Sequence, residues 1–534
     1  MSRFVRASKY RHVFGQQGKK EHGFDNVKTS NSAWDTNLIA ASSRHISINW
    51  NASGGGAFAI LPLPTPFGPL PHGFPYKLPE LIPLARSHTG PVLDTDWSPF
   101  NDSVVASAGE DGKVMIWKVE DSVFEGWGQE HWEPQDFDPV ARLDVSPRRV
   151  GQVLFHPTAN NVLASTTGDH IVKLWDLENP ENPRSVLSGH GDAIQSLAFN
   201  PAGNLLVTTC RDRKLRLFDP RAGGEAVRVG EGHGGIKGAR VTWMGERDSI
   251  ATTGFSRMSD RQVGLWETGG LTNIKTMTID QTSGVLMPFW TDNNILFLAG
   301  KGDGNIRYYE YEHDQLYALA EYKSSDPQRG MCFLPRRALN VSECEIARAY
   351  KVAGSSIEAI AFIVPRKSES FQADIYPPAP SSEPALSPSE FFAGKTASPK
   401  LVSLENGSIS FGAPPSTLPS APPPHAAPAP TRSTSAPAPA PAPVPVPAIS
   451  IHVDPTPSPV VIKSDPSPIS PAELRMLVRS QTIPEDEPSV SMLKDENARL
   501  DAELREARAQ IRNLELQVES IKANARKAAA LLDS

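Results

Sequence analysis

The sequence predicts an all-β protein built as a seven-bladed β-propeller. Residues 87–118 contain three short runs rich in branched and aromatic side chains, separated by turn residues. Strands that end in an aromatic residue then recur as KLWD, RLFD, GLWE and RYYE, at intervals of 43 to 58 residues. A four-stranded blade takes about 40–45 residues, so the longer intervals fit inserted loops, and a lone blade cannot bury both of its faces. The recurring aromatic residues are Trp117, Trp175, Phe218, Trp266 and Tyr309.

Residues 87–118 resemble one WD repeat, a blade unit that starts near a histidine and ends at a tryptophan. In WD-repeat proteins these two residues join a serine and an aspartate in a hydrogen-bonded chain that ties the strands of the blade together. GH pairs precede two later units, but Phe218 has no indole N–H and no GH pair precedes KLWD. The candidate tetrad is His88, Ser107, Asp111 and Trp117.

The N-terminal 31 residues are locally cationic and begin with a strand-like stretch, Phe4 to Phe14. Propellers commonly close their ring with an N-terminal strand that completes the last blade, which removes two exposed sheet edges. We expect Phe4 to Phe14 to do this. Charge alone leaves two interpretations of Lys19, Lys20 and Lys28, an ordinary solvated face or a binding face.

The seven blades, with the closing strand, are expected to occupy residues 1–367. Gly54 to Gly56 favour a hairpin turn over a phosphate loop, because no helix and no GK[ST] follow them. The last blade is the least repeat-like, with a helical or irregular excursion expected around Glu343 to Tyr350. The expected blades are 32–84, 85–137, 138–186, 187–229, 230–275, 276–320 and 321–365.

Composition changes abruptly after residue 367. Residues 368–412 keep some apolar content and are expected to form an extension packed on the propeller. Residues 413–489 are dominated by Pro, Ala and Ser. Such a run cannot bury enough apolar surface to fold, so a disordered, extended linker is expected.

Residues 490–534 have a helical composition, with a seam of mostly apolar residues at alternating steps of three and four. This spacing predicts a coiled coil that self-associates rather than packing back onto the ring. Asn497 at an a position would set the register, and dimer and trimer are both left open. The expected oligomerisation residues are Asn497, Leu500, Leu504, Ile511, Leu514, Val518 and Ile521.

Composition excludes several classes of function. The net charge of −7 and pI of about 6.0 disfavour a nucleic-acid binder. The three cysteines suit neither a disulfide framework nor a zinc site. No apolar run is long enough to span a membrane, and the N-terminus lacks a secretory signal, so a cytoplasmic protein is expected. No motif joins a nucleophile to a base or gathers metal ligands, so we expect neither enzymatic activity nor a cofactor.

Several stretches resemble the coronin family, in its short, coiled-coil type and with a fungal character. They include SKYRHVFGQ, ASGGGAFAILPL and PQRGMCFLPRRALNVSECEIARAYK, and the resemblance spans residues 1–405 and the coiled coil. It implies F-actin binding, bundling or crosslinking of filaments, control of actin turnover, and contact with the actin-related-protein branching complex. It also implies a place at the actin cytoskeleton, in cortical actin patches, and leaves cofilin and microtubules open as further partners.

The resemblance also suggests where filaments bind. A basic residue in the family's N-terminal segment is linked to filament binding, and Lys28 occupies that place where many relatives have Arg. An ammonium group acts as a point charge without the bidentate fork of a guanidinium. Lys19 and Lys20 would extend this cationic face. The alternative function is a generic WD-repeat scaffold that presents peptide partners to another complex.

Overall fold

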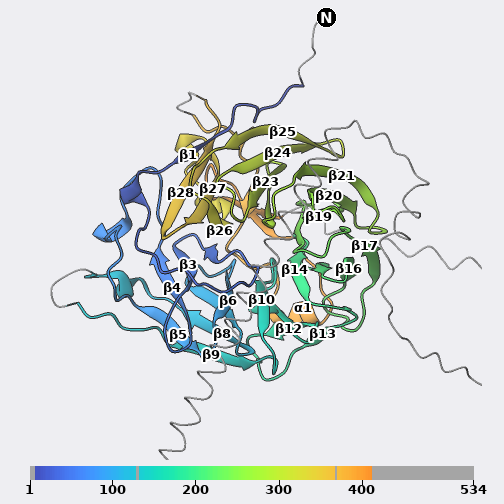
Figure 1. Ribbon diagram of the computed structural model, residues 1–534, viewed down its shortest axis with the longest axis horizontal. Helices are drawn as coiled ribbons and strands as arrows, with labels where there is room; N and C mark the ends of the chain where they lie inside the picture. The colour runs from blue at the N-terminus through green and yellow to red at the C-terminus, as the bar shows by residue number, and fades with distance from the viewer. Residues whose placement is uncertain (1–5, 128–131, 367–369, 412–534) are drawn as a thin grey trace, which may run out of the picture. The chain divides into compact units, whose positions relative to one another are not determined.

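The computed structural model describes residues 6–127, 132–366 and 370–411 of the chain. Within these residues, seven four-stranded antiparallel sheets form a closed ring (Figure 1). The first strand of each sheet lies innermost, where β2, β6, β10, β14 and β18 contact one another in series. The prediction of an all-β, seven-bladed propeller is therefore confirmed.

Blades one to six are antiparallel meanders with the last strand at the rim, whereas in blade seven the N-terminal strand β1 takes the rim position. Blade one contains β2 (Ile39–Ala41), β3 (His45–Trp50), β4 (Gly56–Pro62) and β5 (Leu84–His88), and blade two β6 (Val92–Trp97), β7 (Val104–Gly109), β8 (Lys113–Lys118) and β9 (Pro139–Asp144). Blade three contains β10 (Val150–Phe155), β11 (Val162–Thr167), β12 (Val172–Asp176) and β13 (Ser185–Leu187), and blade four β14 (Ile194–Phe199), β15 (Leu206–Cys210), β16 (Lys214–Phe218) and β17 (Arg228–Glu231). Blade five contains β18 (Arg240–Trp243), β19 (Ser249–Phe255), β20 (Arg261–Glu267) and β21 (Asn273–Asp280), and blade six β22 (Leu286–Thr291), β23 (Ile295–Gly300), β24 (Ile306–Glu312) and β25 (Gln315–Tyr322). Blade seven contains β26 (Gln328–Phe333), β27 (Glu345–Ala353), β28 (Ser356–Ile363) and β1 (Phe14–Gln17).

The hydrophobic core lies between neighbouring sheets rather than inside any one of them. Between blades two and three, for example, Ala106 and Ile116 pack with Val150, Val153 and Phe155. Each blade thus buries its faces only against its neighbours, which is why the sequence repeats as a series.

The N-terminal strand closes the ring, but it is not the strand that the sequence indicated. β1 pairs antiparallel with β28, from Phe14 opposite Ile363 to Gln17 opposite Ile360. The stretch expected to pair, Phe4 to Phe14, therefore meets the ladder only at its last residue. The aromatic and branched residues before it anchor the chain instead: Tyr10 and Val13 are buried in the core of blades six and seven.

Two further expectations about the blades are wrong in detail. The border expected at residue 85 cuts through β5, which is the rim strand of blade one. The repeat read from sequence begins at the end of one sheet and continues into the next, so it is out of phase with the blade.

The excursion expected at Glu343 to Tyr350 is only a short 3₁₀ turn, Val341–Glu343, followed by β27. All nine residues of β27 are buried, and they include a Glu345–Arg348 ion pair.

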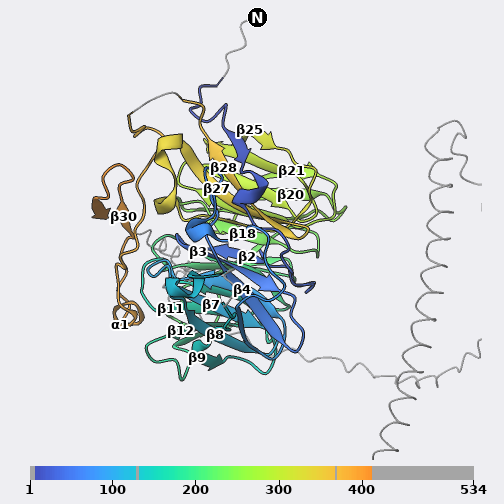
Figure 2. The same cartoon turned by 90° about the vertical axis from the view of Figure 1, so that its left-hand side faces the viewer.

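Residues 370–411 run along one face of the ring (Figure 2). They form a three-stranded sheet of β29 (Ala379–Pro380), β30 (Lys400–Val402) and β31 (Ile409–Phe411), together with the short helix α1 (Pro388–Phe392). Ser387 and Glu390 form a capping box at the start of α1. The buried ring of Phe391 lies 4.2 Å from that of His156, between centroids. No helix in residues 370–411, or elsewhere in the described ring, is long and apolar enough to cross a membrane.

The linker expected at residues 413–489 and the coiled coil expected at 490–534, with its oligomerisation residues Asn497 to Ile521, lie outside the described residues.

Candidate functional site

The structure brings the four residues of the candidate tetrad together. His88 Nδ1 lies 3.0 Å from both carboxylate oxygens of Asp111, and His88 Nε2 lies 2.7 Å from Ser107 Oγ. The indole Nε1–H of Trp117 donates to the same Ser107 oxygen at 2.9 Å. Burial raises the pKa of Asp111, but hydrogen bonds from His88 and from nearby backbone amides outweigh it, so the net shift is downward.

This chain of hydrogen bonds joins two blades and does not only tie the strands of one. His88 ends β5 of blade one, whereas Ser107 lies on β7 and Trp117 on β8 of blade two. The tetrad therefore acts as a staple across the joint between blades. The expectation that the tetrad ties one blade differs from this result because the sequence repeat starts in the last strand of one sheet and continues into the next sheet.

Other joints use shortened versions of the staple. His233 lies 2.8 Å from Thr252 Oγ1, which also accepts from Trp266 at 2.7 Å. In blade three, by contrast, Trp175 donates to Ser165 at 2.9 Å, and no histidine of the described ring completes the chain. The ion pairs at the joint between blades five and six were not predicted from the sequence. There the buried Arg261 pairs with carboxylates of β21 and of the β23–β24 turn.

The three candidate lysines lie on the segment between β1 and β2. Lys20 Nζ lies 3.0 Å from Asp25 Oδ2, and Lys28 Nζ lies 2.7 Å from Glu80 Oε2. These contacts lower the pKa of Asp25 and of Glu80 through hydrogen bonding to the lysines. Lys19 is exposed and has no ion-pair partner within the described segments. Two of the three charges are therefore already paired.

A loop that the sequence reasoning did not single out lies beside Lys28. The backbone N–H of Asp25 donates to Tyr76 O at 2.7 Å, and that of Leu78 donates to Asp25 O at 3.0 Å. This pairing brings the proline-rich loop between β4 and β5 alongside the lysine segment. Leu81, near the end of this loop before β5, is 74% exposed. We call the composite formed by Lys20, Lys28, Tyr76, Lys77 and Leu81 the Lys28 surface.

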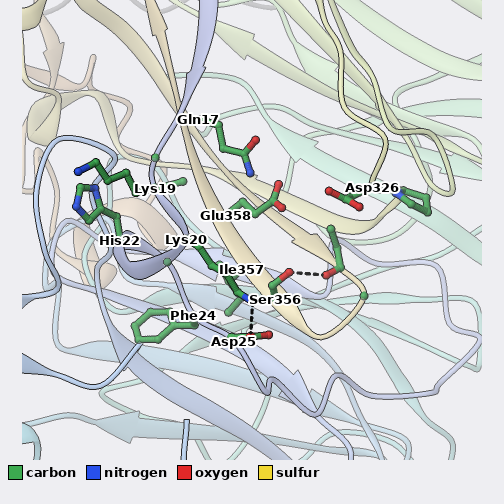
Figure 3. Close-up of a pocket in the computed structure, with 16 residues that line it drawn as sticks. Gln17, Lys19, Lys20, His22, Phe24, Asp25, Asp326, Ser356, Ile357 and Glu358 are labelled. Carbon is green, nitrogen blue, oxygen red and sulfur yellow. Dashed lines mark hydrogen bonds and ion pairs between the residues drawn. The ribbon is translucent and has the colours of Figure 1, made fainter. Parts of the chain in front are cut away.

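A cavity of about 460 Å³ opens where the lysine segment meets the hairpin of β27 and β28 (Figure 3). Lys19 and Lys20 lie at its edge, and Lys20 points toward Asp25. Glu358 and Asp326 also line it. Lys28 is not among the lining residues. The cavity mixes both signs of charge, so it does not extend the Lys28 surface into a single cationic pocket.

The described part of the chain contains no group of three or more His, Cys, Asp or Glu residues that could hold a metal ion. Its histidines at blade joints bond serine and threonine hydroxyls instead.

The ring and its inter-blade staples define a WD-repeat β-propeller. Residues 81–118 and 181–219 match the WD domain, G-beta repeat, and residues 357–399 match a type of WD40 repeat. Residues 3–67 match a domain of unknown function, DUF1899.

The similar proteins identify the family more closely. The chain is 40% identical to human Coronin-2A over 414 residues, covering 76% of this chain and 75% of that protein. It is 42% identical to Dictyostelium discoideum Coronin-A, covering 77% of this chain and 88% of that protein. The chain therefore belongs to the coronin family, as the sequence resemblance indicated.

Two fungal relatives and one solved structure agree with this assignment. The chain is 52% identical to the coronin-like protein crn1 of Schizosaccharomyces pombe, over 75% of this chain and 65% of that protein. It is 47% identical to the coronin-like protein of Saccharomyces cerevisiae, over 76% of this chain and 61% of that protein. The match thus spans less than two thirds of each fungal protein. The WD40 domain of Toxoplasma gondii coronin superposes with a TM-score of 0.67 at 29% identity, covering 75% of this chain and 99% of that domain.

Proposed function

We propose that the chain is a non-enzymatic, F-actin-binding adaptor that bundles or crosslinks filaments and regulates actin turnover. Its membership of the coronin family is the observation that carries this proposal. Through residues beyond the ring it would contact the actin-related-protein branching complex, with cofilin and microtubules as further candidates. Its place in the cell would be the cytoplasmic actin cytoskeleton, including cortical actin patches.

The filament-binding site that we propose is the Lys28 surface, with Lys19 beside it. Protein interfaces gain most of their affinity from a few apolar anchors surrounded by polar groups. Exposed Tyr76 and Leu81 can supply the anchors, and Lys20 and Lys77 the charge that an acidic filament surface requires. Lys28 is 40% exposed and pairs with a still more exposed Glu80, so water screens the pair and an acidic partner can replace Glu80 at little cost.

Charge reversal at one position tests this site. Lys28→Glu should weaken co-sedimentation of the full chain with F-actin by about tenfold at low salt, and by less as salt rises and screens the charge. Lys113→Glu is a matched control, because Lys113 is 38% exposed and pairs with Asp144 at 2.9 Å on blade two. If both variants lose affinity equally, or neither does, Lys28 does not belong to the filament site.

Multivalency is the second part of the proposal. A weak site on each ring becomes effective when coiled coils link several rings, because the second contact forms at high effective concentration. Removing residues 490–534 should lower apparent filament affinity by at least about tenfold and abolish bundling, while light scattering reports a monomer. Unchanged pelleting by the truncated chain would refute the argument from avidity. A full chain that ignores filaments but recovers subunits of another complex would favour the scaffold function instead.

A further inference from the structure

An exposed patch on blades four and five combines apolar and cationic side chains that the proposed function does not use. Met258 is 84% exposed and Ile236 is 62% exposed, although both are large apolar residues. Met258 lies on the turn between β19 and β20, and Ile236 lies on the loop between β17 and β18. Apolar groups that stay exposed within a polar rim are typical of interaction surfaces.

Backbone hydrogen bonds join three loops into this patch. The N–H of Gly235 donates to Phe255 O at 2.7 Å, which brings the β17–β18 loop against the turn that contains Met258. The N–H of Gly232 donates to Arg213 O, also at 2.7 Å, which adds the turn between β15 and β16. The three loops therefore form one surface across two neighbouring blades, which we call the Met258 surface. Its exposed side chains are Arg211, Arg213, Ile236, Lys237, Arg257 and Met258.

The four cations of the Met258 surface form no ion pair with any carboxylate of the described residues. The carboxylates on the same turns are already engaged. Asp212 pairs with Arg216 at 2.6 Å. Asp260 Oδ2 accepts a hydrogen bond from Ser256 Oγ at 2.7 Å. The surface is thus locally cationic on a chain whose net charge is −7, and an acidic partner would supply the complementary charge.

The loops present these side chains from fixed positions. Ser256 Oγ accepts the backbone N–H groups of Met258 and Asp260, each at 3.1 Å, and so orders the turn from within. Lys237 Nζ lies 4.9 Å from the centroid of the buried Phe255 ring, which holds this ammonium group beside the turn. A surface that is ordered before binding loses less conformational entropy when a partner arrives. Ile236 and Met258 are therefore suited to act as anchors.

We propose that the Met258 surface binds a short acidic segment of another protein, in which carboxylates flank one or two apolar side chains. The apolar side chains cover Ile236 and Met258, and the carboxylates pair with the surrounding cations. Two anchors on adjacent loops suit a linear segment better than a broad anionic plane such as a membrane. Exposed Glu231, at the start of the β17–β18 loop, would repel such a plane, whereas a short segment need not reach it.

This site is separate from the proposed filament site. In a ring of seven blades, blade one lies opposite the joint between blades four and five (Figure 1). The Lys28 surface is built beside blade one, so the ring can contact a filament there and hold the acidic segment at its other side.

The probe is a fluorescein-labelled peptide in which glutamates flank two leucines, and fluorescence anisotropy measures its binding to the full chain. Met258→Ser and Arg257→Glu should each weaken binding by about tenfold. Two control variants should leave binding unchanged. Val140→Ser removes an apolar side chain on β9 that is 63% exposed, and Lys275→Glu reverses an exposed cation on β21.

Peptide variants test the two parts of the recognition. Replacing the leucines by serines, or the glutamates by glutamines, should weaken binding by about tenfold in each case. Equal affinity of the peptide for wild-type protein and for Met258→Ser would overturn the proposal, because the surface would then hold anions by charge alone. Tighter binding to vesicles of phosphatidylserine and phosphatidylcholine than to the peptide, lost in Met258→Ser, would also overturn it and assign the surface to a membrane.

Filament co-sedimentation distinguishes this inference from the proposed function. Met258→Ser and Arg257→Glu should pellet with F-actin as the wild-type chain does, whereas Lys28→Glu should pellet less. Loss of pelleting in the first two variants would make the Met258 surface a filament contact and overturn the separate site. Peptide binding that survives in Lys28→Glu would support two independent sites.

Discussion

The staple between blades one and two makes a quantitative prediction about stability. Ser107→Ala removes one oxygen that serves two partners, since Ser107 Oγ lies 2.7 Å from His88 Nε2 and accepts from Trp117 Nε1 at 2.9 Å. All three side chains are buried. The substitution leaves a histidine nitrogen and an indole N–H without their partner, and the alanine has no means of replacing it.

The magnitude follows from the number of groups left unsatisfied. Leaving one buried polar group without a hydrogen bond costs about 1–3 kcal/mol, so Ser107→Ala, which leaves two such groups, should lower the free energy of unfolding by about 2–6 kcal/mol. Ser165→Ala is the matched control in blade three, because among the described residues buried Ser165 accepts only from Trp175, at 2.9 Å. That variant should lose about 1–3 kcal/mol. The difference between the two losses in the free energy of unfolding isolates the hydrogen bond that crosses between blades.

Urea unfolding followed by tryptophan fluorescence is a suitable assay, because all ten tryptophans lie before residue 291 and report on the ring alone. His88→Ala, combined with Ser107→Ala in a double-mutant cycle, should show coupling of about 1–2 kcal/mol. Equal losses in Ser107→Ala and Ser165→Ala, with no coupling in the cycle, would refute the claim that the staple holds the blades together.

Two further predictions concern acid stability and the extension. Burial, followed by the nearby Arg216 charge, lowers the pKa of His190 to about 4 in the folded ring. The unfolded chain therefore binds a proton at this residue more readily, and the free energy of unfolding should fall as pH drops from 6.5 towards 4, by about 3 kcal/mol at the lower limit. His190→Gln should make the urea midpoint depend less on pH in that window. An unchanged dependence of the midpoint on pH would contradict the role given to His190. Phe391→Ala removes a fully buried ring at a cost of about 3–5 kcal/mol, which should expose residues 370–411 to rapid proteolysis while tryptophan fluorescence stays native. Equal protection in the variant and in wild type would show that Phe391 does not anchor the extension.

Much of the fold could be predicted because a propeller is a local pattern repeated. The aromatic strand ends, the turn aspartates and the GH pairs are all short-range signals, and their spacing gives the number of blades. The same signals misplace the blade borders. His88 belongs to the sheet before Ser107, and no feature of residues 87–118 shows which partner strand β5 selects.

The candidate site was less predictable for the same reason. Lys28 is found by resemblance, but its neighbours Tyr76, Lys77 and Leu81 come from a loop about fifty residues away in sequence. Their approach depends on backbone pairing that leaves no periodic signal. The excursion expected around Glu343 to Tyr350 is largely strand instead, and there Glu345 and Arg348 satisfy each other's charge inside the ring.

The sequence alone determined the class of fold, the number of blades and the family, because these depend on repeated local patterns and on long stretches of similarity. Only the tertiary structure decided which blade each staple joins and which loop lies beside Lys28. Those features arise where segments distant in sequence meet, and pairing between such segments is set by packing of the whole ring rather than by local composition.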